Sequence, residues 1–181
     1  MRETQREALE LFSARGFDAV TVDEIAATLD IAASTVYRHF GTKEAIVLWD
    51  EHEAELDDSL DRELRSKPPL HAVRDAFVGS LAPRYDDDLG FQLKRVSFIF
   101  ATEAVHAAAV EADFAARDEL TAALRKTLAR SNRDAAPIIA GAALLALDIA
   151  LDRWQQAKGK KPLGALITDA FAPLDHLGSI R

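Results

Sequence analysis

Apolar residues recur along nearly the whole chain with the period of about 3.6 residues that marks amphipathic helices, and no stretch alternates as a half-buried strand would. The first such segment, residues 2–15, places Ala8, Leu9 and Phe12 on one stripe. Further helices are expected over residues 22–29, 33–39, 43–65, 70–82, 87–106, 109–130, 134–157 and 163–173. The pattern predicts an all-α protein.

Short polar motifs mark the expected helix ends. Gly16 follows the first helix, where a left-handed cap is favoured, and Thr21-Val22-Asp23-Glu24 is a Thr-x-x-Glu capping box ahead of an apolar run. Thr42 follows Gly41 and is placed to cap the next helix, and Pro68-Pro69 and Pro83 are expected to end helices. We predict an N-terminal three-helix domain over residues 1–47 and a larger helical domain over residues 48–181.

Two of the short helices, between Val22 and Phe40, match a helix-turn-helix in length and apolar pattern. Ala26 is small where the two helices cross, and Asp30 stands where the turn favours a left-handed residue. With Ile31 and Val36 facing inward, the outer and leading surface of the second helix consists of Ala33, Ser34, Thr35, Arg38 and His39. The leading end of such a recognition helix reads base edges in the major groove.

Each polar residue there also has an ordinary structural explanation. Tyr37 is equally suited to a core position with its hydroxyl at the surface, and Arg38 to a solvated position. His39 is compatible with a surface or capping role, and Lys43 with pairing to a surface carboxylate. Their combination on a helix-turn-helix frame favours DNA contact.

The stretch TVDEIAATLDIAASTVYRHFGTKEAI resembles the N-terminal domain of the TetR family of transcriptional regulators, with a close match over residues 8–48. The resemblance implies that Thr35, Tyr37, His39 and Lys43 contact the DNA backbone and that Ala33, Ser34 and Arg38 lie nearest the bases. It also implies a double-stranded DNA operator, a small-molecule effector and a homodimer. The sequence departs from the family pattern at three positions, where Asp30, Ala32 and Ser34 replace the usual glycine, serine and glycine.

The charge balance restricts how DNA can be held. The chain has a formal net charge of −8, and residues 1–47 hold five Lys/Arg against eight Asp/Glu, which gives −3 (5 − 8). Neither part has the basic excess of a non-specific nucleic-acid binder. Any DNA contact must therefore come from a local patch of residues.

The segment over residues 136–154 is almost wholly apolar, so it must be covered on nearly every side. A two-fold partner can supply that cover, with residues 163–173 beside it, although a central core helix of a monomer is the alternative. Asp148, inside the run, is suited to pairing with an arginine, contacting a ligand or lying at a wetted rim. The expected interface consists of Ile138, Gly141, Ala142, Leu145, Asp148, Ile149 and Asp152.

An aromatic stripe in the helix 87–106 is the candidate ligand site. Its residues recur on approximately one face, and aromatic walls with few polar groups suit a small, largely apolar ligand, with Arg95 available to an acidic end. An ordinary core stripe is the competing explanation. The expected lining is Phe77, Phe91, Arg95, Phe98, Thr102, His106 and Trp154.

Several classes of chemistry have no motif in this sequence. The chain has no cysteine, and its five histidines, including His52, are scattered without metal-binding spacing. We therefore expect no metal, no cofactor, no catalytic residue and no enzyme. No apolar run approaches the roughly 18 residues of a membrane span, and the N-terminus has no signal-peptide core, so we expect no membrane association and a cytoplasmic location.

These features together predict a ligand-responsive transcriptional regulator, a repressor that a small molecule releases from a near-palindromic operator. The alternative is an all-α small-molecule binding protein or enzyme that retains the helix-turn-helix as scaffold.

Overall fold

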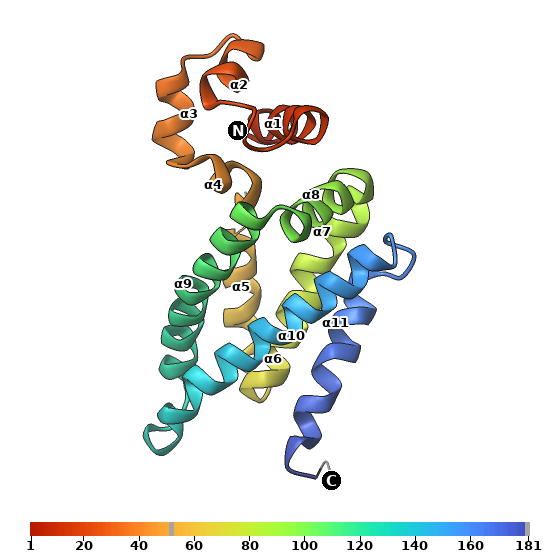
Figure 1. The fold of residues 1–181 in the computed structure, drawn as a ribbon. Helices are drawn as coiled ribbons and strands as arrows, with labels where there is room; N and C mark the ends of the chain where they lie inside the picture. The colour runs from red at the N-terminus through yellow and green to blue at the C-terminus, as the bar shows by residue number, and fades with distance from the viewer. Residues whose placement is uncertain (51–52, 180–181) are drawn as a thin grey trace. The chain divides into compact units, whose positions relative to one another are not determined.

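The computed structural model describes residues 1–50 and 53–179, which form helices without any strand among them (Figure 1). This confirms the predicted all-α class. The chain divides into two compact units, Met1–Glu51 with Lys94–Glu111, and His52–Leu93 with Ala112–Arg181. The first unit is larger than the predicted domain 1–47, because residues 94–111 pack with the N-terminal helices.

The first unit is built on four short helices at its N-terminal end: α1 (Arg2–Arg15), α2 (Val22–Thr28), α3 (Ala33–Phe40) and α4 (Lys43–Leu48). It also contains most of α8 (Leu89–Ala101) and the beginning of α9 (Glu103–Thr127). One hydrophobic core joins these helices. Its buried members are Ala8, Phe12, Phe17, Val20, Val22, Ile25, Ala26, Val36, Phe40, Ile46, Val47 and Val105.

Local polar contacts end and begin these helices largely as predicted. In the capping box, the Glu24 backbone N–H donates to Thr21 Oγ1 at 3.2 Å, and the Thr21 N–H donates to Glu24 Oε2 at 2.8 Å. That Thr21 N–H bond, followed by the guanidinium of Arg15, lowers the pKa of Glu24 to about 2. Thr42 caps α4, with its Oγ1 accepting from the Ala45 N–H at 3.1 Å.

Two turn residues adopt the backbone conformations that their positions require. Asp30 has a φ of 53° in the turn between α2 and α3, which confirms the left-handed residue expected there. Gly16 has a φ of 90° but a ψ of 149°, so it ends α1 outside the left-handed helical region that was predicted. Its N–H nevertheless donates to Phe12 O at 2.9 Å.

The second unit contains α5 (Glu53–Glu63), α6 (Pro69–Ala76), the π-helical turn η1 (Phe77–Leu81) and α7 (Ala82–Asp87). The second half of α9, the 3-10 segment η2 (Arg130–Ala135), α10 (Ala136–Gln156), α11 (Leu163–Phe171) and η3 (Ala172–Ser179) follow. Helices α10 and α11 lie side by side (Figure 1).

Alanines form most of the buried face of α10, and the large side chain of Trp154 completes it. That face consists of Ala136, Ala140, Ala143, Ala146, Ala150 and Trp154. The larger apolar side chains of the same helix face outward, with Ile138 72% and Leu145 61% exposed. Alanines permit close packing inside the unit, whereas the exposed side chains leave an apolar surface that the described part of the chain does not cover.

The segment Arg130–Gln156 meets the length and composition of a membrane span, with a mean hydropathy of 1.8 and 28% of its window buried. It is the only such helix among the described residues. The expectation that no apolar run reaches this length is therefore wrong. The test uses only length and composition, so an apolar helix whose outward face packs on another protein chain also passes it.

Three predicted helix boundaries are corrected. The single helix expected over 43–65 is divided, since α4 ends at Leu48 and α5 begins at Glu53. Pro83 does not end a helix, because it lies in the first turn of α7, where its missing N–H is tolerated. The break expected between 106 and 109 lies instead at Thr102, between α8 and α9.

Candidate functional site

Helix α3 presents one buried and one exposed face. Val36 and Phe40 are buried in the core of the first unit, while Ser34, Tyr37, Arg38 and His39 are exposed. Tyr37 is 48% exposed, which excludes the core position considered for it. No hydrogen bond or ion pair joins Arg38 to another residue in the part of the chain that the structure describes. The guanidinium is therefore available to an external acceptor.

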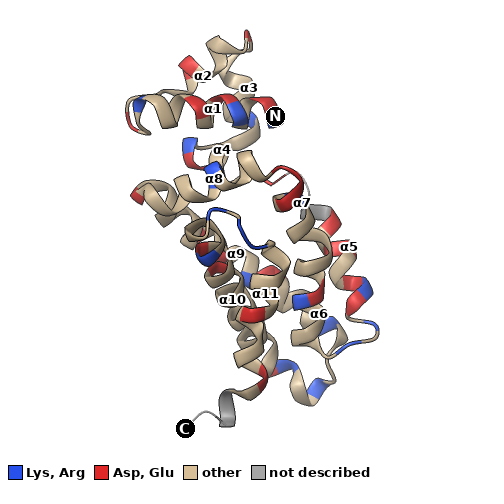
Figure 2. Cartoon of the chain, turned by 90° about the vertical axis from the view of Figure 1, so that its right-hand side faces the viewer, with Lys and Arg blue, Asp and Glu red and all other residues tan. Residues whose placement is uncertain are grey.

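The beginning of α3 is less exposed and lacks a side-chain cap. Ala33 and Thr35 are only partly exposed, and the N-cap residue Ala32 makes no side-chain hydrogen bond. This agrees with the loss of a cap expected from alanine in place of serine. Helix α1 of the same unit carries acidic and basic residues interspersed along its length (Figure 2), so it does not form a uniformly basic helix.

His39 is exposed, but its ring is held by an aromatic cluster. Its ring centroid lies 4.6 Å from that of Phe40 and 5.6 Å from that of Trp49. The rings of Phe40 and Trp49 in turn meet edge to face at 5.9 Å. The cluster links the end of α3 to the end of α4, so the orientation of the recognition helix depends on where α4 ends.

Lys43 is bound to backbone carbonyls of its own unit, and its contact with the DNA backbone stays a prediction. Its Nζ donates to Phe17 O at 2.7 Å and to Val20 O at 3.1 Å, and it lies 4.2 Å from the Phe17 ring centroid. These carbonyls belong to the loop between α1 and α2, which has acceptors that helical bonds do not use. Lys43 therefore ties α4 to that loop, and neither a DNA phosphate nor a surface carboxylate is needed to explain it.

Two buried polar side chains hold the carboxyl end of α4. Arg95 is 7% exposed and donates from Nε to Val47 O and from a terminal nitrogen to Leu48 O, both at 2.8 Å. Gln5 donates from Nε2 to Val47 O at 3.1 Å and to Trp49 O at 2.8 Å. The last carbonyls of a helix have no partners within it, and here α1 and α8 supply them. Arg95 was expected to hold an acidic ligand, but its guanidinium binds these carbonyls instead.

The other residues of the predicted ligand stripe do not come together. Phe98 packs against the core of the first unit, with its ring centroid 6.0 Å from that of Phe12. His106 is exposed, and its ring centroid lies 5.6 Å from that of Phe100. Thr102 marks the junction of α8 and α9, and Phe91 belongs to the second unit. Arg95 and Phe98 therefore belong to the packing of the first unit, as the competing explanation proposed, and a ligand role for the other residues of the stripe stays a prediction.

Trp154 is a core residue of the second unit. It is fully buried in the second unit, where its ring meets that of Tyr85 edge to face at 5.6 Å. Its indole N–H has no hydrogen-bond partner among the described residues. Its role in this structure is to fill the core beneath α10.

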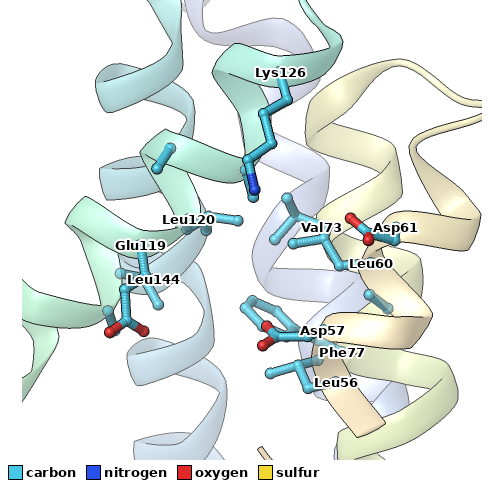
Figure 3. Close-up of a pocket in the computed structure, with 14 residues that line it drawn as sticks. Leu56, Asp57, Leu60, Asp61, Val73, Phe77, Glu119, Leu120, Lys126 and Leu144 are labelled. Carbon is cyan, nitrogen blue, oxygen red and sulfur yellow. The ribbon is translucent and has the colours of Figure 1, made fainter. Parts of the chain in front are cut away.

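A cavity of about 430 Å³ opens in the second unit among α5, α6, η1, α9 and α10 (Figure 3). Its apolar walls are formed by Leu56, Leu60, Val73, Phe77, Leu120 and Leu144, with Ala76, Ala116, Ala122 and Ala123 between them. The charged side chains around it are Asp57, Asp61, Glu119 and Lys126. Phe77 is the one predicted ligand residue that lines it.

The sequence pattern did not single out this cavity, because its walls come from four helices that each look ordinary. Leu56 and Leu60 stand one turn apart on α5, a spacing that a core stripe shares. The sequence feature that could have indicated the cavity is the set of alanines on α9, because small side chains opposite large apolar ones leave unfilled space between helices. Which helices face one another is not visible from any one of them.

The expected interface residues lie on the outward side of α10. Ile138, Leu145, Asp148 and Ile149 are exposed, whereas Gly141, Ala142 and Asp152 are partly covered. A Cβ added at Gly141 would lie 3.8 Å from Arg117 of α9, so that glycine also borders its own unit. Asp152 accepts from the side-chain amides of Gln155 and Gln156 at 3.0 and 2.8 Å.

Comparisons with known proteins agree with this architecture. Residues 6–48 match the family model for bacterial regulatory proteins of the tetR family, and residues 67–177 match the model for the MftR C-terminal domain. The HTH-type transcriptional regulator TcmR of Streptomyces glaucescens is 35% identical over 88 residues, which cover 46% of this chain and 38% of TcmR. A Mycobacterium tuberculosis protein named as the mycofactocin biosynthesis transcriptional regulator MftR is 39% identical over 75 residues, which cover 39% of this chain and 38% of MftR.

Each of these matches spans about two fifths of the relative's length. Among solved structures, the TetR-family repressor FadR of Thermus thermophilus, crystallised with lauroyl-CoA, aligns with a TM-score of 0.57 at 20% identity. That alignment covers 99% of this chain and 95% of FadR, and at this identity it supports the fold. Because the MftR C-terminal model alone matches well over half of the chain, behind a tetR-family N-terminal region, the chain belongs to the TetR family of regulatory proteins.

Proposed function

We propose that this protein is a DNA-binding transcriptional regulator that reads DNA with α3. The observation that carries the proposal is the division of that helix, with Val36 and Phe40 buried and Ser34, Tyr37 and Arg38 exposed. A fixed apolar face holds the helix on its frame, while the polar face offers hydroxyls and a guanidinium to base edges and phosphates. Ser34 and Arg38 are the proposed base contacts, and Thr35, Tyr37 and His39 the proposed backbone contacts.

The regulator is proposed to act as a homodimer. The outward face of α10 exposes Ile138, Leu145 and Ile149, and a second copy is the natural cover for such a face on a two-fold axis. Two copies of α3 would then enter successive major grooves about 34–36 Å apart, on a near-palindromic operator. A role on operator DNA also implies a cytoplasmic location.

The cavity of the second unit is the proposed effector site. Its volume of about 430 Å³ falls in the range of small-molecule sites, about 300–1,000 Å³, and its walls are largely apolar. An effector that binds better to the DNA-released geometry shifts the population toward it, and the proposed regulator is a repressor that such an effector releases from its operator. FadR was solved with lauroyl-CoA, so a related fold accommodates an acyl chain in another protein.

Selection of duplexes from a random pool with the full chain tests the DNA-binding role. We expect a selected near-palindromic sequence whose binding weakens steeply as salt rises, because each neutralised phosphate releases counterions. Selection of no duplex would refute the proposal and favour a protein that retains the helix-turn-helix as scaffold.

A further inference from the structure

The charged groups around the cavity are mostly of one sign. Asp57 and Asp61 stand one turn apart on α5, and Glu119 and Lys126 extend from α9 on the other side of the space (Figure 3). Three carboxylates and one ammonium give these side chains a formal charge of −2 (1 − 3). All four side chains are exposed and meet solvent at the edge of the cavity, which is called its mouth here, and the other ten lining residues are apolar.

These carboxylates are not neutralised by the chain itself. No ion pair joins Asp57, Asp61 or Glu119 to another residue in the part of the chain that the structure describes. By contrast, Glu55 on the same helix is bound by Arg84 at 3.0 Å. No group of three acidic or histidine side chains among the described residues is placed to hold a metal ion. The negative potential at the mouth is therefore available to a bound molecule.

We infer that the cavity selects an organic cation, an apolar body that fills the interior with an amine or quaternary ammonium group at the mouth. This rests on the proposed role of the cavity as the effector site. The leucines, Val73 and Phe77 bury the apolar body, while Asp57, Asp61 and Glu119 attract the cationic head. A carboxylate or a polyphosphate at the same mouth is repelled by three carboxylates and attracted by one ammonium group, that of Lys126.

The size of the preference follows from Coulomb's law. One unit charge about 4 Å from an opposite charge in water gains about fivefold in affinity, and a like charge loses about as much. Contact with two of the three carboxylates therefore predicts that a cation binds more tightly than a neutral analogue by roughly one order of magnitude. Added salt reduces this preference, because exposed charges are screened.

A matched series of ten-carbon probes tests the inference on the full chain by calorimetry, without DNA. The probes are decyltrimethylammonium, decan-1-ol, decanoate and decanoyl-CoA, which differ in charge and share the alkyl chain. We expect decyltrimethylammonium to bind most tightly, decan-1-ol next, and both anions most weakly. Tighter binding of decanoate or decanoyl-CoA, or no binding of the cation, would overturn the inference.

Two variants with the same change in net charge locate the effect. Asp57→Asn with Asp61→Asn removes two charges from the mouth and should bring the cation to within about twofold of decan-1-ol. Asp58→Asn with Asp118→Asn removes one charge from α5 and one from α9, both outside the cavity lining, and should keep the preference. If both variants change the preference for the cation over decan-1-ol equally, the effect does not come from the carboxylates of the cavity, and the inference is overturned. Ala123→Phe narrows the cavity and should lower the affinity for decyltrimethylammonium and for decan-1-ol by the same factor.

The same probes separate this inference from the proposed function. Release of the selected duplex is measured in parallel with probe binding. A cation that binds as expected but leaves the duplex bound supports the ligand class and refutes the effector role. An alcohol or anion that binds more tightly than the cation and releases the duplex supports the effector role and refutes the ligand class.

Discussion

Replacement of Arg95 tests whether the carboxyl end of α4 is held by side chains from other helices. Arg95→Met keeps an unbranched apolar stem and removes the guanidinium bonds to Val47 O and Leu48 O, each 2.8 Å long. Val47 O keeps Gln5 Nε2 at 3.1 Å as a donor, whereas Leu48 O loses the one donor described here. The main cost is therefore one carbonyl without a protein partner and two lost charge-assisted bonds.

The magnitude can be worked from these bonds. A hydrogen bond to a charged group contributes about 1.5–3 kcal/mol, and the acceptor shared with Gln5 reduces the loss, so we expect about 2–4 kcal/mol in the free energy of unfolding. At a urea slope of about 2 kcal/mol per molar, the midpoint falls by about 1–2 M. Arg95→Lys, which can reach one carbonyl, should lose about half as much.

Urea unfolding followed by the emission of Trp49 is the assay. The chain has two tryptophans, so a Trp154→Phe background leaves Trp49, at the end of α4, as the sole reporter. Lys94→Met is the matched control, since Lys94 is the preceding residue on α8 and forms a partly exposed ion pair with Glu10 at 2.6 Å. Such a pair contributes about 0–1 kcal/mol.

The outcome that would refute the reasoning is a midpoint for Arg95→Met no lower than that for Lys94→Met. A double-mutant cycle with Gln5→Met adds a second check. Because both side chains donate to Val47 O, the double variant should lose about 1 kcal/mol more than the sum of the single variants.

Three further predictions concern DNA binding, acid stability and assembly. Arg38→Ala is expected to weaken DNA binding and change base preference by about 1–3 kcal/mol, whereas Lys43→Met is expected to lower stability and leave the salt slope unchanged. Gel shifts at several salt concentrations measure both, and a reduced slope for Lys43→Met would contradict its structural role. Glu24 has its pKa lowered from 4.5 to about 2, so its contribution to stability is complete above about pH 4.5 and is lost as pH falls toward 2. Glu24→Gln should therefore be less stable than wild type at pH 6 and equal to it near pH 2, with Asp18→Asn as an unaffected control in denaturant titrations. Leu145→Asp places a charge at a position whose side chain is 61% exposed here and is expected to convert the proposed dimer to a monomer in light scattering. A dimer mass that the substitution leaves unchanged would exclude this face as the interface.

Features that depend on residues close together in the sequence could be predicted from the sequence alone. The capping box at Thr21 and Glu24, the left-handed Asp30 and the cap at Thr42 each involve contacts within three or four positions. The helix-turn-helix and the apolar, outward-facing α10 follow from helical periodicity in the same way. For this reason the fold class and the exposed surface of α3 were predictable, since helical order is specified largely over one turn.

Contacts between residues far apart in the sequence could not be predicted in this way. The end of α4 depends on Gln5 and Arg95, which lie 42 and 48 positions from Val47, and Lys43 reaches carbonyls 23 and 26 positions away. The sequence does not show which acceptor a charged or amide side chain will bind, so it did not predict that Arg95 and Lys43 bind backbone carbonyls of the same unit. The cavity belongs to the same class, because its volume is the space left between four helices after packing, and that space is a property of their arrangement.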